Sequence, residues 1–448
     1  MKPSEQKAIL IGAGLVGSLL STYLTRYGYK VEIYERRPDM RKDKISAGKS
    51  INLALSDRGW RGLEGVGLSD VVRKVAIPMA GRMIHHQNGT TNYQAYGKEG
   101  QAIWSVSRGG LNCVLMDESE KSGASIHYNE RCTNVDLENK TASFENTVTG
   151  VKKTVNGDLI ISSDGAFSSG RLSMMFTDRY NYSQNYLQHG YKELCIPPAK
   201  DGTHQLEKNC LHIWPRGGYM LIALPNIDGS FTCTLFFPFE GNPSFATLDT
   251  PQKVQSFFNE IFPDATPLMP TLTEDFFGNP TGSLVTVKCF PWTYKNHALL
   301  IGDAAHAIVP FYGQGMNCGF EDCVELDELI RKYDHNWKEI MPAYEKQRKP
   351  NGDAIADLAV ANFYEMRDLV GHPDFLLRKK IEARIYEKHP EKWVPLYTLV
   401  TFSKTSYHYA LTQGKKQDAI MDKIMATPGI ESKWDSPEIE QSILGMLS

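Results

Sequence analysis

The sequence feature that most constrains the fold is the stretch "KAILIGAGLVGSLLSTYLTRYGYKVEIYER" at residues 7–36. Its short apolar run at 8–11 predicts a buried strand, and an apolar helix follows to about residue 27 before a second strand begins. Gly12, Gly14 and Gly17 form a GxGxxG pattern at the junction of strand and helix. A strand, a glycine-rich turn, a helix and a second strand in this order predict a βαβ unit that binds a dinucleotide.

Each glycine of this turn has its own predicted task. Gly12 allows the tight turn, Gly14 lets the backbone approach a pyrophosphate, and Gly17 lets the helix pack closely on the strand. The helix amino terminus supplies unpaired N–H groups and partial positive charge for the phosphates. Glu35 ends the second strand and is expected to accept hydrogen bonds from an adenosine ribose. NAD and FAD share this ADP half, so both remain candidates at this point.

Two later connections favour FAD. "GDLIISSDGAFSSGRLSM" places Asp164 after a buried strand at 159–162, and "HALLIGDAAHAIVPFYGQGMN" places Asp303 after another strand. Asp303 suits the ribityl hydroxyls of a flavin, a group that NAD lacks. Gly313 and Gly315 leave room for the flat isoalloxazine ring, and Met316 and Asn317 begin a helix whose positive end faces it. The lack of bulky side chains in this late segment is therefore explained by a planar cofactor.

Composition excludes several other classes of protein. The 448 residues have a net charge of −3 and 41% hydrophobic content, which describes an ordinary globular protein with no basic surface for nucleic acid. No apolar run reaches the length of a membrane span, and the amino end has no secretory signal pattern. The eight cysteines form no CxxC pair, which favours free thiols, no metal site and a cytoplasmic location.

The flavin segments are far apart in the chain, so the chain must leave the flavin domain and return to it. The intervening residues read as strands rich in β-branched and aromatic side chains, and the pattern turns helical from about Trp337. We therefore expect an α/β fold with a Rossmann-like FAD-binding domain, a β-sheet substrate domain and a helical carboxyl-terminal region. The expected boundaries are 1–75, 98–187 and 289–335 for the first, 76–97 and 188–288 for the second, and 336–448 for the third.

The residues also carry a resemblance. GxGxxG with Glu35, followed by Asp164-Gly165 and Gly302-Asp303, resembles the single-component FAD aromatic hydroxylases of the para-hydroxybenzoate hydroxylase type. Longer blocks resemble the kynurenine 3-monooxygenase family along nearly the whole chain, among them "KSINLALSDRG", "GRMIHH", "HGYKELCIPP", "LHIWPRGGYMLIALPN", "GDAAHAIVPFYGQGMNCGFEDC" and "PLYTLVTFS". Animal members continue into a membrane-anchoring extension, and this chain ends at Ser448, so the expected form is the soluble, bacterial type without a membrane partner.

The resemblance implies an NADPH- and O2-dependent hydroxylation of L-kynurenine at the aromatic 3-position, through a flavin C4a-hydroperoxide, within tryptophan catabolism and pyridine nucleotide biosynthesis. It implies that Arg82 and Tyr96 bind the substrate carboxylate and that Asn362 and Tyr397 complete the clasp. Phe311, Tyr312 and Gln314 are expected to shape the pocket, joined by Leu221, Ile222 and Phe237 from the sheet. No side chain is expected to act as the catalytic base; His306 is interpreted as structural. A homodimer is the expected assembly.

The resemblance also extends the set of residues expected to line FAD, some of them through the backbone alone. Beyond the glycines and acids already named, these are Val16, Tyr34, Arg36, Arg37, Ala54, Arg108 and Cys132. The sequence has no second βαβ unit, so NADPH must bind transiently, with "RRPDMRKDK" at 36–44 as a candidate contact. Two alternatives stay open: a flavin hydroxylase of another aromatic acid, and a flavoprotein reductase that incorporates no oxygen.

Overall fold

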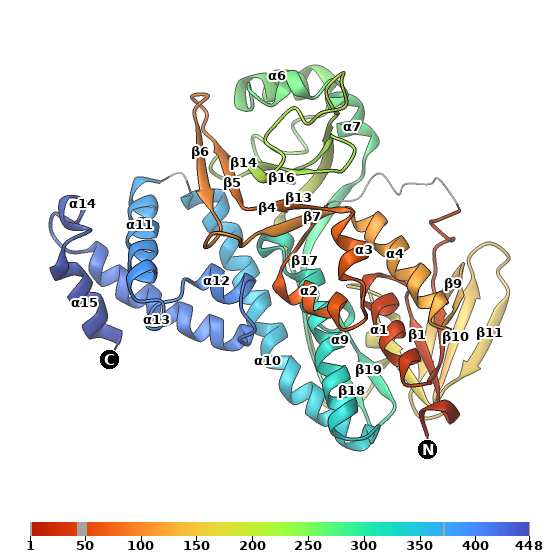
Figure 1. The fold of residues 1–448 in the computed structure, drawn as a ribbon. Coiled ribbons are helices and arrows are strands. Elements are labelled where there is room, and N and C mark those ends of the chain that lie inside the picture. The colour runs from red at the N-terminus through yellow and green to blue at the C-terminus, as the bar shows by residue number, and fades with distance from the viewer. Residues whose placement is uncertain (1, 43–51, 371, 448) are drawn as a thin grey trace.

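The central sheet brings together strands from both ends of the chain. The structure is a computed structural model that describes residues 2–42, 52–370 and 372–447 (Figure 1). The strand β1 pairs in parallel with β2 on one side and β12 on the other, and β12 pairs in parallel with β19. In spatial order the strands are β18 (Thr293–Tyr294), β19 (Ala298–Leu300), β12 (Leu159–Ser162), β1 (Lys7–Ile11), β2 (Lys30–Tyr34) and β8 (Ser125–His127).

Helices cover this sheet and complete the predicted βαβ unit. The helix α1 (Leu15–Arg26) connects β1 to β2, and its side chains share one hydrophobic core with the strands. The short apolar run of β1 is buried along nearly its whole length, as its sequence predicts. The other helices of these segments are α2 (Asp57–Glu64), α3 (Ser69–Arg73), α4 (Arg108–Lys121), α5 (Ser169–Met174), α8 (Asp303–His306) and α9 (Gly315–Lys332).

A second, seven-stranded sheet is built from the intervening residues. Two of its strands, β5 and β6, come from residues 76–97, the early segment that was expected to belong to the β-sheet substrate domain. The longest strand, β13, begins at Asn181 rather than near residue 188. In spatial order the strands are β17 (Thr281–Phe290), β13 (Asn181–Ile196), β16 (Phe231–Pro238), β15 (Met220–Pro225), β14 (Cys210–Pro215), β5 (Gly81–His85) and β6 (Thr91–Ala95).

The two faces of the seven-stranded sheet carry different cores. The helices α6 (Pro251–Ile261) and α7 (Leu272–Gly278) cover one face with an aromatic-rich cluster. The opposite face packs on the turn after β19 and on the carboxyl-terminal helices. The helix α6 starts after Thr250, whose side chain accepts a hydrogen bond from the Lys253 N–H.

Two small antiparallel sheets complete the strands. β3 (Leu53–Leu55), β7 (Ile103–Val106) and β4 (Ala76–Met79) lie between the two large sheets. The other small sheet lies at the far edge of the molecule in Figure 1 and consists of β11 (Lys152–Asn156), β10 (Thr141–Asn146) and β9 (Glu130–Asp136).

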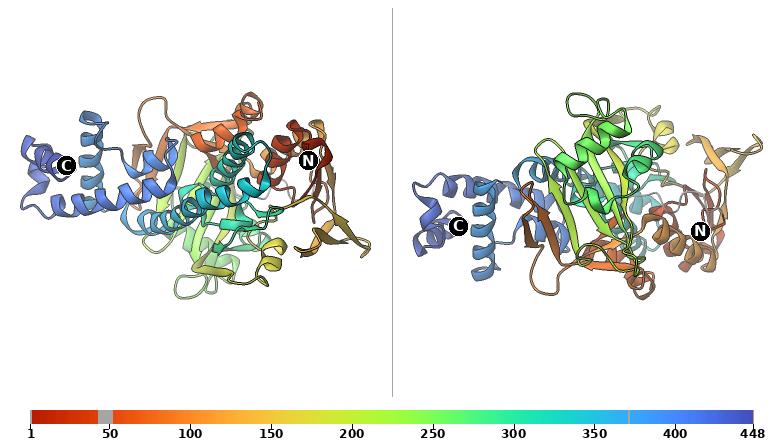
Figure 2. Two further views of the ribbon diagram at one scale, coloured as in Figure 1. Left: turned by 90° about the horizontal axis from the view of Figure 1, so that it is seen from below. Right: turned by 90° about the horizontal axis from the view of Figure 1, so that it is seen from above.

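The carboxyl-terminal helices project from the opposite end of the molecule (Figures 1 and 2). The helix α10 runs unbroken over 28 residues, Trp337–Tyr364, although Pro342 and Pro350 lie inside it, and a π-helical turn follows at Glu365–Leu369. The remaining helices are α11 (Pro373–Lys388), α12 (Leu396–Thr401), α13 (Tyr407–Met425), α14 (Ile430–Lys433) and α15 (Pro437–Leu447). α11 and α13–α15 share a hydrophobic cluster of their own.

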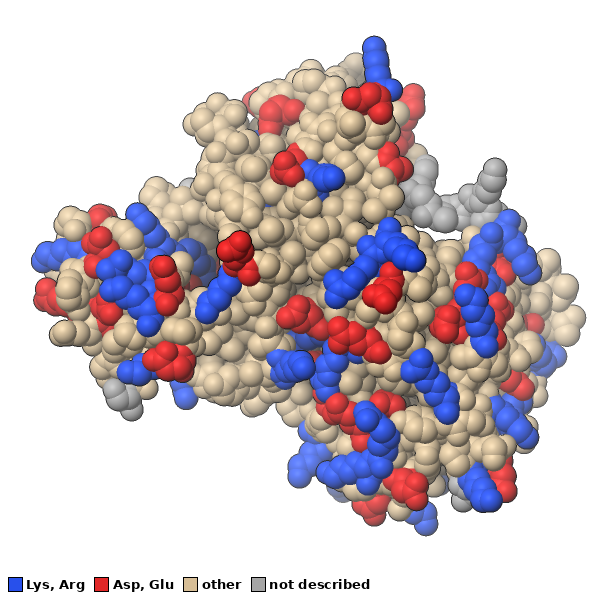
Figure 3. Space-filling model, viewed as in Figure 1, with Lys and Arg blue, Asp and Glu red and all other residues tan. Residues whose placement is uncertain are grey.

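Two further observations concern the surface charge and the apolar character of the helices. Basic and acidic side chains lie intermingled on the face shown in Figure 3. Among the described residues, none of the helices combines the length and apolar character that a membrane crossing requires. The α/β class, with a Rossmann-like part, a second sheet and a helical carboxyl-terminal region, is confirmed.

Candidate active site

The predicted cofactor residues follow strands that end at the same edge of the central sheet. Gly12 follows β1, Glu35 follows β2, Asp164 lies just beyond β12, and Asp303 lies just beyond β19. These four strands are parallel neighbours, so their carboxyl ends lie together although the residues are nearly 300 positions apart. In open α/β sheets this edge is where ligands bind.

The geometry of the three glycines agrees with their predicted tasks. Gly12 has a φ of 97°, which only glycine adopts readily. A Cβ on Gly17 would lie 2.1 Å from the Gly12 carbonyl oxygen, so the close approach of helix and strand requires glycine. Apart from its chain neighbours, a Cβ on Gly14 would have no atom of the described residues within 4 Å. Within the described part of the chain, the space beside Gly14 is therefore open, as a turn that receives a pyrophosphate requires.

Glu35 is buried and held in place by the glycine turn. One carboxylate oxygen accepts a hydrogen bond from the Ala13 N–H at 2.8 Å, and the other accepts from the N–H and Nε of Arg37. Burial alone would raise the pKa of Glu35, but Arg37 and these N–H groups hold it below its usual value. An ionised carboxylate has about four acceptor sites, so about one remains for a ribose hydroxyl.

Some of the residues close to Glu35 have side chains that already contact other residues, and others have exposed side chains. The Tyr34 ring stacks between His127 and Phe144, so the backbone is what Tyr34 can offer to a ligand. Arg36 is exposed. In the proposed NADPH contact, Arg41 already pairs with Asp39, Asp117 and Glu120. Asp43 and Lys44 of that stretch lie outside the described residues, as do Lys49, Ser50 and Ile51 of the block "KSINLALSDRG".

Asp164 contacts the start of α5 and keeps one oxygen without a partner among the described residues. Its Oδ2 accepts a hydrogen bond from the Ser169 N–H at 2.6 Å, whereas Oδ1 is buried and has no hydrogen-bond partner among the described residues. Burial raises the pKa of Asp164. Cys132 lies close by: its carbonyl accepts from the Ser169 hydroxyl, and burial raises the pKa of its thiol to about 12. A buried carboxylate oxygen without a donor suits a polar ligand at this edge.

Asp303 and Arg108 also keep polar groups free. Asp303 is half-buried at the start of α8, and its carboxylate accepts no hydrogen bond from any residue that the structure describes. Arg108 is exposed at the start of α4 and forms neither a hydrogen bond nor an ion pair within the described part of the chain. A free acid suits hydroxyl donors, and a free guanidinium suits phosphate.

The start of α9 is held by Asn317. Its Oδ1 accepts from the Ser56 N–H at 2.9 Å, and its Nδ2 donates to the carbonyls of Ala54 and Gly313. The side chain therefore binds protein on all sides, and only its backbone N–H is left for a cofactor. Asn317 is fully buried, so its side chain is not available to contact FAD.

The first turn of α9 is the predicted contact for the flavin ring. The N–H groups of Gly315, Met316 and Asn317 are the first of the helix and have no carbonyl partner within it. The Val16 side chain packs against Gly302 and Gly319, so α1 and α9 meet at this point. Helix amino termini, free carboxylates and an unfilled glycine turn together fit the phosphates, hydroxyls and ring edge of FAD.

A cluster of tyrosines and one arginine lies on the other side of this turn. The Tyr397 ring stacks on Tyr96 at 5.1 Å and on Tyr312 at 5.7 Å between ring centroids. Burial raises the pKa of these three phenols well above the usual value, and the charge of Arg82 offsets this effect only in part. Arg82 donates to Gln94 and forms no ion pair with a described carboxylate. The cluster offers neutral donors around an unneutralised guanidinium.

Asn362 and Phe311 connect this cluster to α10. The Asn362 Nδ2 donates to the Phe311 carbonyl at 2.7 Å, which leaves its Oδ1 as an acceptor. The Phe311 ring packs against Phe236 and Phe363 at centroid distances of 4.7 and 4.4 Å. The four predicted substrate residues and two of the three predicted pocket residues thus belong to one neighbourhood; the third, Gln314, is buried and bonded to Tyr407.

Two of the predicted sheet residues face away from this neighbourhood. Leu221 and Phe237 are buried in the cluster under α6 and α7, on the opposite face of the sheet. The prediction that they wall the pocket is therefore wrong, because side chains alternate along a strand. Ile222 and Phe236, each one residue away, face the tyrosine side. The alternation of side chains between the two faces of β15 and β16 is the sequence signal that distinguishes Leu221 and Phe237 from Ile222 and Phe236.

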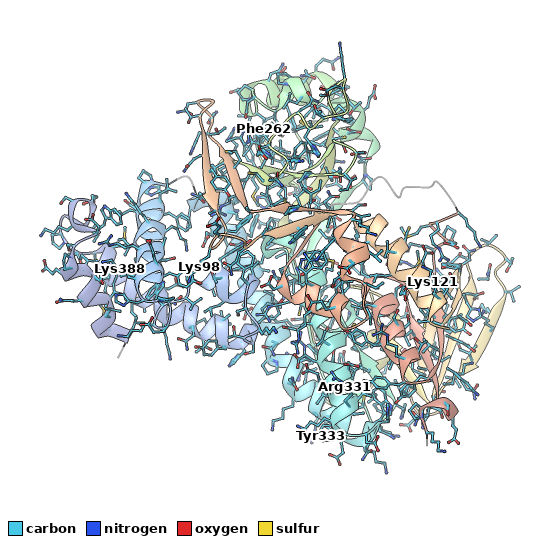
Figure 4. The ribbon with its side chains drawn as sticks, in the orientation of Figure 1. Lys98, Lys121, Phe262, Arg331, Tyr333 and Lys388 are labelled. Atoms are coloured by element: carbon cyan, nitrogen blue, oxygen red, sulfur yellow. The ribbon has the colours of Figure 1, made fainter. Side chains whose placement is uncertain are left out.

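Lys98 adds a further contact between the β6 side and the carboxyl-terminal helices. It follows β6, and its Nζ lies 4.5 Å from the centroid of the Tyr386 ring on α11 (Figure 4). Together with the stacking of Tyr96 on Tyr397, this contact joins the β5–β6 hairpin to the helices.

A buried network of charges that the sequence did not predict lies behind the cofactor turn. Asp322 accepts from the Gly302 N–H at 3.0 Å, from His306 Nε2 at 2.6 Å and from Arg348 Nε at 2.7 Å. Glu321 accepts from Arg348 and from Arg58. Burial alone would lower the pKa of His306, but Asp322 raises it well above the usual value, so the ring is a cation and not a base. This agrees with its structural interpretation.

Known proteins resemble this chain over nearly its whole length. A family model described as FAD binding domain matches residues 5–189 and 289–359. Kynurenine 3-monooxygenase of Flavobacterium psychrophilum is 51% identical over 99% of both chains, and that of Dictyostelium discoideum is 46% identical over 93% of this chain and 92% of its own length. Among solved structures, 2-methyl-3-hydroxypyridine-5-carboxylic acid oxygenase shares the fold with a TM-score of 0.67 at 20% identity, covering 87% of this chain and 98% of its own. The chain therefore belongs to the kynurenine 3-monooxygenase family, and its central sheet carries an FAD-binding domain.

Proposed function

We propose that this chain is a monooxygenase that uses FAD, NADPH and O2 to hydroxylate L-kynurenine at the aromatic 3-position. The relatives named above support the activity, and one observation of the structure supports the substrate class. Arg82 has no carboxylate partner among the described residues and lies within electrostatic reach of three neutral tyrosines, one of them on the turn before α9. A free guanidinium with phenolic donors suits the carboxylate of an amino acid.

The α-amino group of the substrate requires acceptors instead of donors. The Oδ1 of Asn362 is left free by the hydrogen bond from its Nδ2 to Phe311. Glu365 follows in the π-helical turn, and its charge contributes to raising the pKa of Tyr312, which places it close to the tyrosine cluster. We propose that Asn362 and Glu365 bind the ammonium group while Arg82, Tyr96 and Tyr397 bind the carboxylate.

FAD, when bound and reduced by NADPH, supplies the activated oxygen of the hydroxylation. The protein residues orient the substrate ring and exclude water from it, a task that fits the packed side chains of Phe311, Phe236 and Phe363. The first-turn N–H groups of α9 would stabilise negative charge at the adjacent ring edge. No protein base is required, because the amino group of the substrate already activates the neighbouring ring carbon.

A labelled-oxygen assay tests this proposal. Purified protein loaded with FAD is given NADPH, L-kynurenine and 18O2, and the product is analysed by mass spectrometry. We expect 3-hydroxykynurenine that carries one labelled oxygen. NADPH oxidation that yields no labelled product would favour a reductase, and coupling only with aromatic acids that lack the amino acid group would favour another aromatic hydroxylase.

We also propose that the protein acts in the cytoplasm as a homodimer. The eight cysteines are all free thiols in the structure, which suits a reducing compartment. Size-exclusion chromatography with light scattering tests the assembly, and a monomeric mass would contradict it.

A further inference from the structure

Arg58 extends from α2 into the carboxyl-terminal helices. Its guanidinium is almost fully buried, and it donates to the carbonyls of Val400 at 2.8 Å, Leu399 at 3.2 Å and Thr405 at 2.5 Å. Val400 and Leu399 lie in the last turn of α12, where carbonyls have no partner within the helix. Arg58 satisfies these carbonyls, and its positive charge suits the carboxyl end of a helix.

The same guanidinium also supports Tyr407. The Arg58 Cζ lies 3.9 Å from the centroid of the Tyr407 ring, and the Tyr407 hydroxyl donates to Gln314 Oε1 at 2.8 Å. Gln314 is the residue directly before α9, and only 1% of it is exposed. Because the side-chain oxygen Oε1 of Gln314 accepts the hydrogen bond from Tyr407, the orientation of the Gln314 side-chain amide is fixed.

Arg58 therefore contacts two elements that support the proposed substrate site, the helix α12 and the residue Tyr407. α12 carries Tyr397, whose ring lies between Tyr96 and Tyr312. A shift of this six-residue helix would move Tyr397 out of the stack, and a shift of Tyr407 would release Gln314.

We propose that Arg58 is a positioning residue that holds both Tyr397 and the side-chain amide of Gln314 in place. Substrate binding and efficient use of NADPH therefore depend on Arg58, although it touches neither substrate nor flavin. The kinetic part of this inference rests on the proposed function, whereas the placement of α12 does not. The pair with Glu321 gives Arg58 a second role in the stability of the fold, so the test must separate the two.

Three variants separate positioning from stability. Arg58→Lys keeps a positive charge beside Glu321 but removes the planar fork that reaches three carbonyls. Tyr407→Phe keeps the stacked ring and removes only the hydroxyl that holds Gln314. Arg61→Lys is the matched control, since Arg61 also lies on α2 and pairs with Glu325 and Glu328 of α9 but, within the described part of the chain, forms no hydrogen bond or ion pair with α12.

Hydrogen exchange of the FAD-loaded protein tests the placement of α12 without any enzyme assay. Peptides that cover residues 396–405 are expected to exchange at least several-fold faster in Arg58→Lys than in the wild type, with Arg61→Lys unchanged. Equal exchange in all three proteins would overturn the proposal whatever reaction the enzyme catalyses.

Kinetics test the consequence for the site. In Arg58→Lys and Tyr407→Phe, we expect the KM for L-kynurenine to rise about tenfold, as expected for one hydrogen bond of ordinary strength, and the product formed per NADPH to fall. The Kd for FAD should stay within about twofold of the wild-type value, because neither Arg58 nor Tyr407 is proposed to contact FAD. If Arg58→Lys does not fold, Tyr407→Phe decides: unchanged KM and coupling there contradict the proposal. A wild type that forms no 3-hydroxykynurenine contradicts the proposed function instead and leaves the exchange test valid.

Discussion

At the scale of single residues, the glycine turn separates two kinds of requirement. The Cβ position of Gly17 is blocked by protein atoms, so that glycine serves the fold. A Cβ at Gly14 would have no contact within 4 Å among the described residues beyond its chain neighbours, and its φ of −73° is one that any residue adopts, so we predict that this glycine serves a ligand. The two positions are three residues apart, and substitutions at them should act on different measurements.

The Gly14→Ala variant should keep the stability of the apoprotein and lose affinity for FAD. The added methyl group meets no described residue beyond the chain neighbours of Gly14, so the free energy of unfolding without FAD should change by less than about 0.5 kcal/mol. The Kd for FAD, measured by quenching of flavin fluorescence, should rise at least about tenfold, since roughly 1.4 kcal/mol is lost where the pyrophosphate approaches. Gly17→Ala is the contrasting control and should destabilise the apoprotein. Unchanged FAD affinity in Gly14→Ala would place the cofactor elsewhere.

The Arg82→Met variant should weaken substrate binding and leave FAD binding intact. Loss of a charge-assisted, bidentate contact to a carboxylate costs about 2–3 kcal/mol, so the KM for L-kynurenine should rise roughly 30- to 150-fold. Steady-state NADPH oxidation with product analysis gives this value. The half-buried Arg82 forms no ion pair with a described residue, so thermal stability should hardly change. An unaltered KM would exclude Arg82 from the carboxylate contact.

At the scale of elements, the local pattern predicted two of the helix starts at the site. The helices predicted after the glycine turn at 12–17 and after Gly313 and Gly315 are α1 and α9, because strand, turn and helix signals are local, whereas the short α8 that begins at Asp303 was not predicted. The pairing of Arg58, Glu321, Arg348 and Asp322 could not be predicted, since it joins α2, α9 and α10 over nearly 300 residues. In the sequence these side chains look like ordinary surface charges on amphipathic helices.

The Glu321→Gln variant should show how much this network stabilises the fold and at which pH. Glu321 is buried, and although burial alone would raise its pKa, Arg348 and Arg58 hold it below 4.5. The carboxylate therefore stabilises the folded protein fully above pH 4.5, and this contribution disappears as the pH falls through the lowered folded-state pKa. Removing one partner of a buried pair costs about 3–5 kcal/mol.

Urea unfolding of the wild type and Glu321→Gln at neutral pH and at successively lower pH values below 4.5 measures this effect. The difference in free energy of unfolding should be largest at neutral pH and shrink in the acidic range. The exposed pair of Lys253 with Asp249 offers a control, because solvent screens it and Asp249→Asn should hardly change the stability. A difference that stays constant with pH would contradict the ionised state of Glu321.

At the scale of the whole molecule, the sequence predicted that distant segments meet but not how the parts contact each other. The order of strand, glycine and acid motifs implied one parallel sheet with a second sheet inserted, because such motifs bind at a common edge. The stacking of Tyr96 on Tyr397 and the contact of Lys98 with Tyr386 depend on how the helices pack, which no local pattern encodes. The residue resemblance named Tyr96 and Tyr397, whereas periodicity alone could not distinguish them from ordinary half-buried tyrosines.

Removal of FAD should loosen the molecule as a whole. The proposed ligand contacts come from three distant segments, near residues 12–35, 164 and 303–317, so the cofactor adds to the contacts that already join these segments through the sheet and between α1 and α9. At 100 times its Kd, FAD should add about 2.7 kcal/mol to the free energy of unfolding, which raises the Tm by about 2–4 °C or less for a chain of this size. Thermal unfolding with increasing FAD measures this shift. A Tm that is independent of FAD would argue against a site that spans these segments.

The order of strands in the central sheet also affects how the protein is made. Ile9 of β1 lies beside Ile160 of β12, which in turn lies beside Ala298 of β19. On a ribosome that adds about 5–20 residues per second, the apolar first strand waits roughly 8–30 s for β12 and roughly 15–60 s for β19. During this interval the nascent chain exposes an unpaired apolar edge that aggregates readily unless it is shielded. Cofactor loading must therefore come late in synthesis, and cellular yield should depend on chaperones that bind the emerging amino-terminal third.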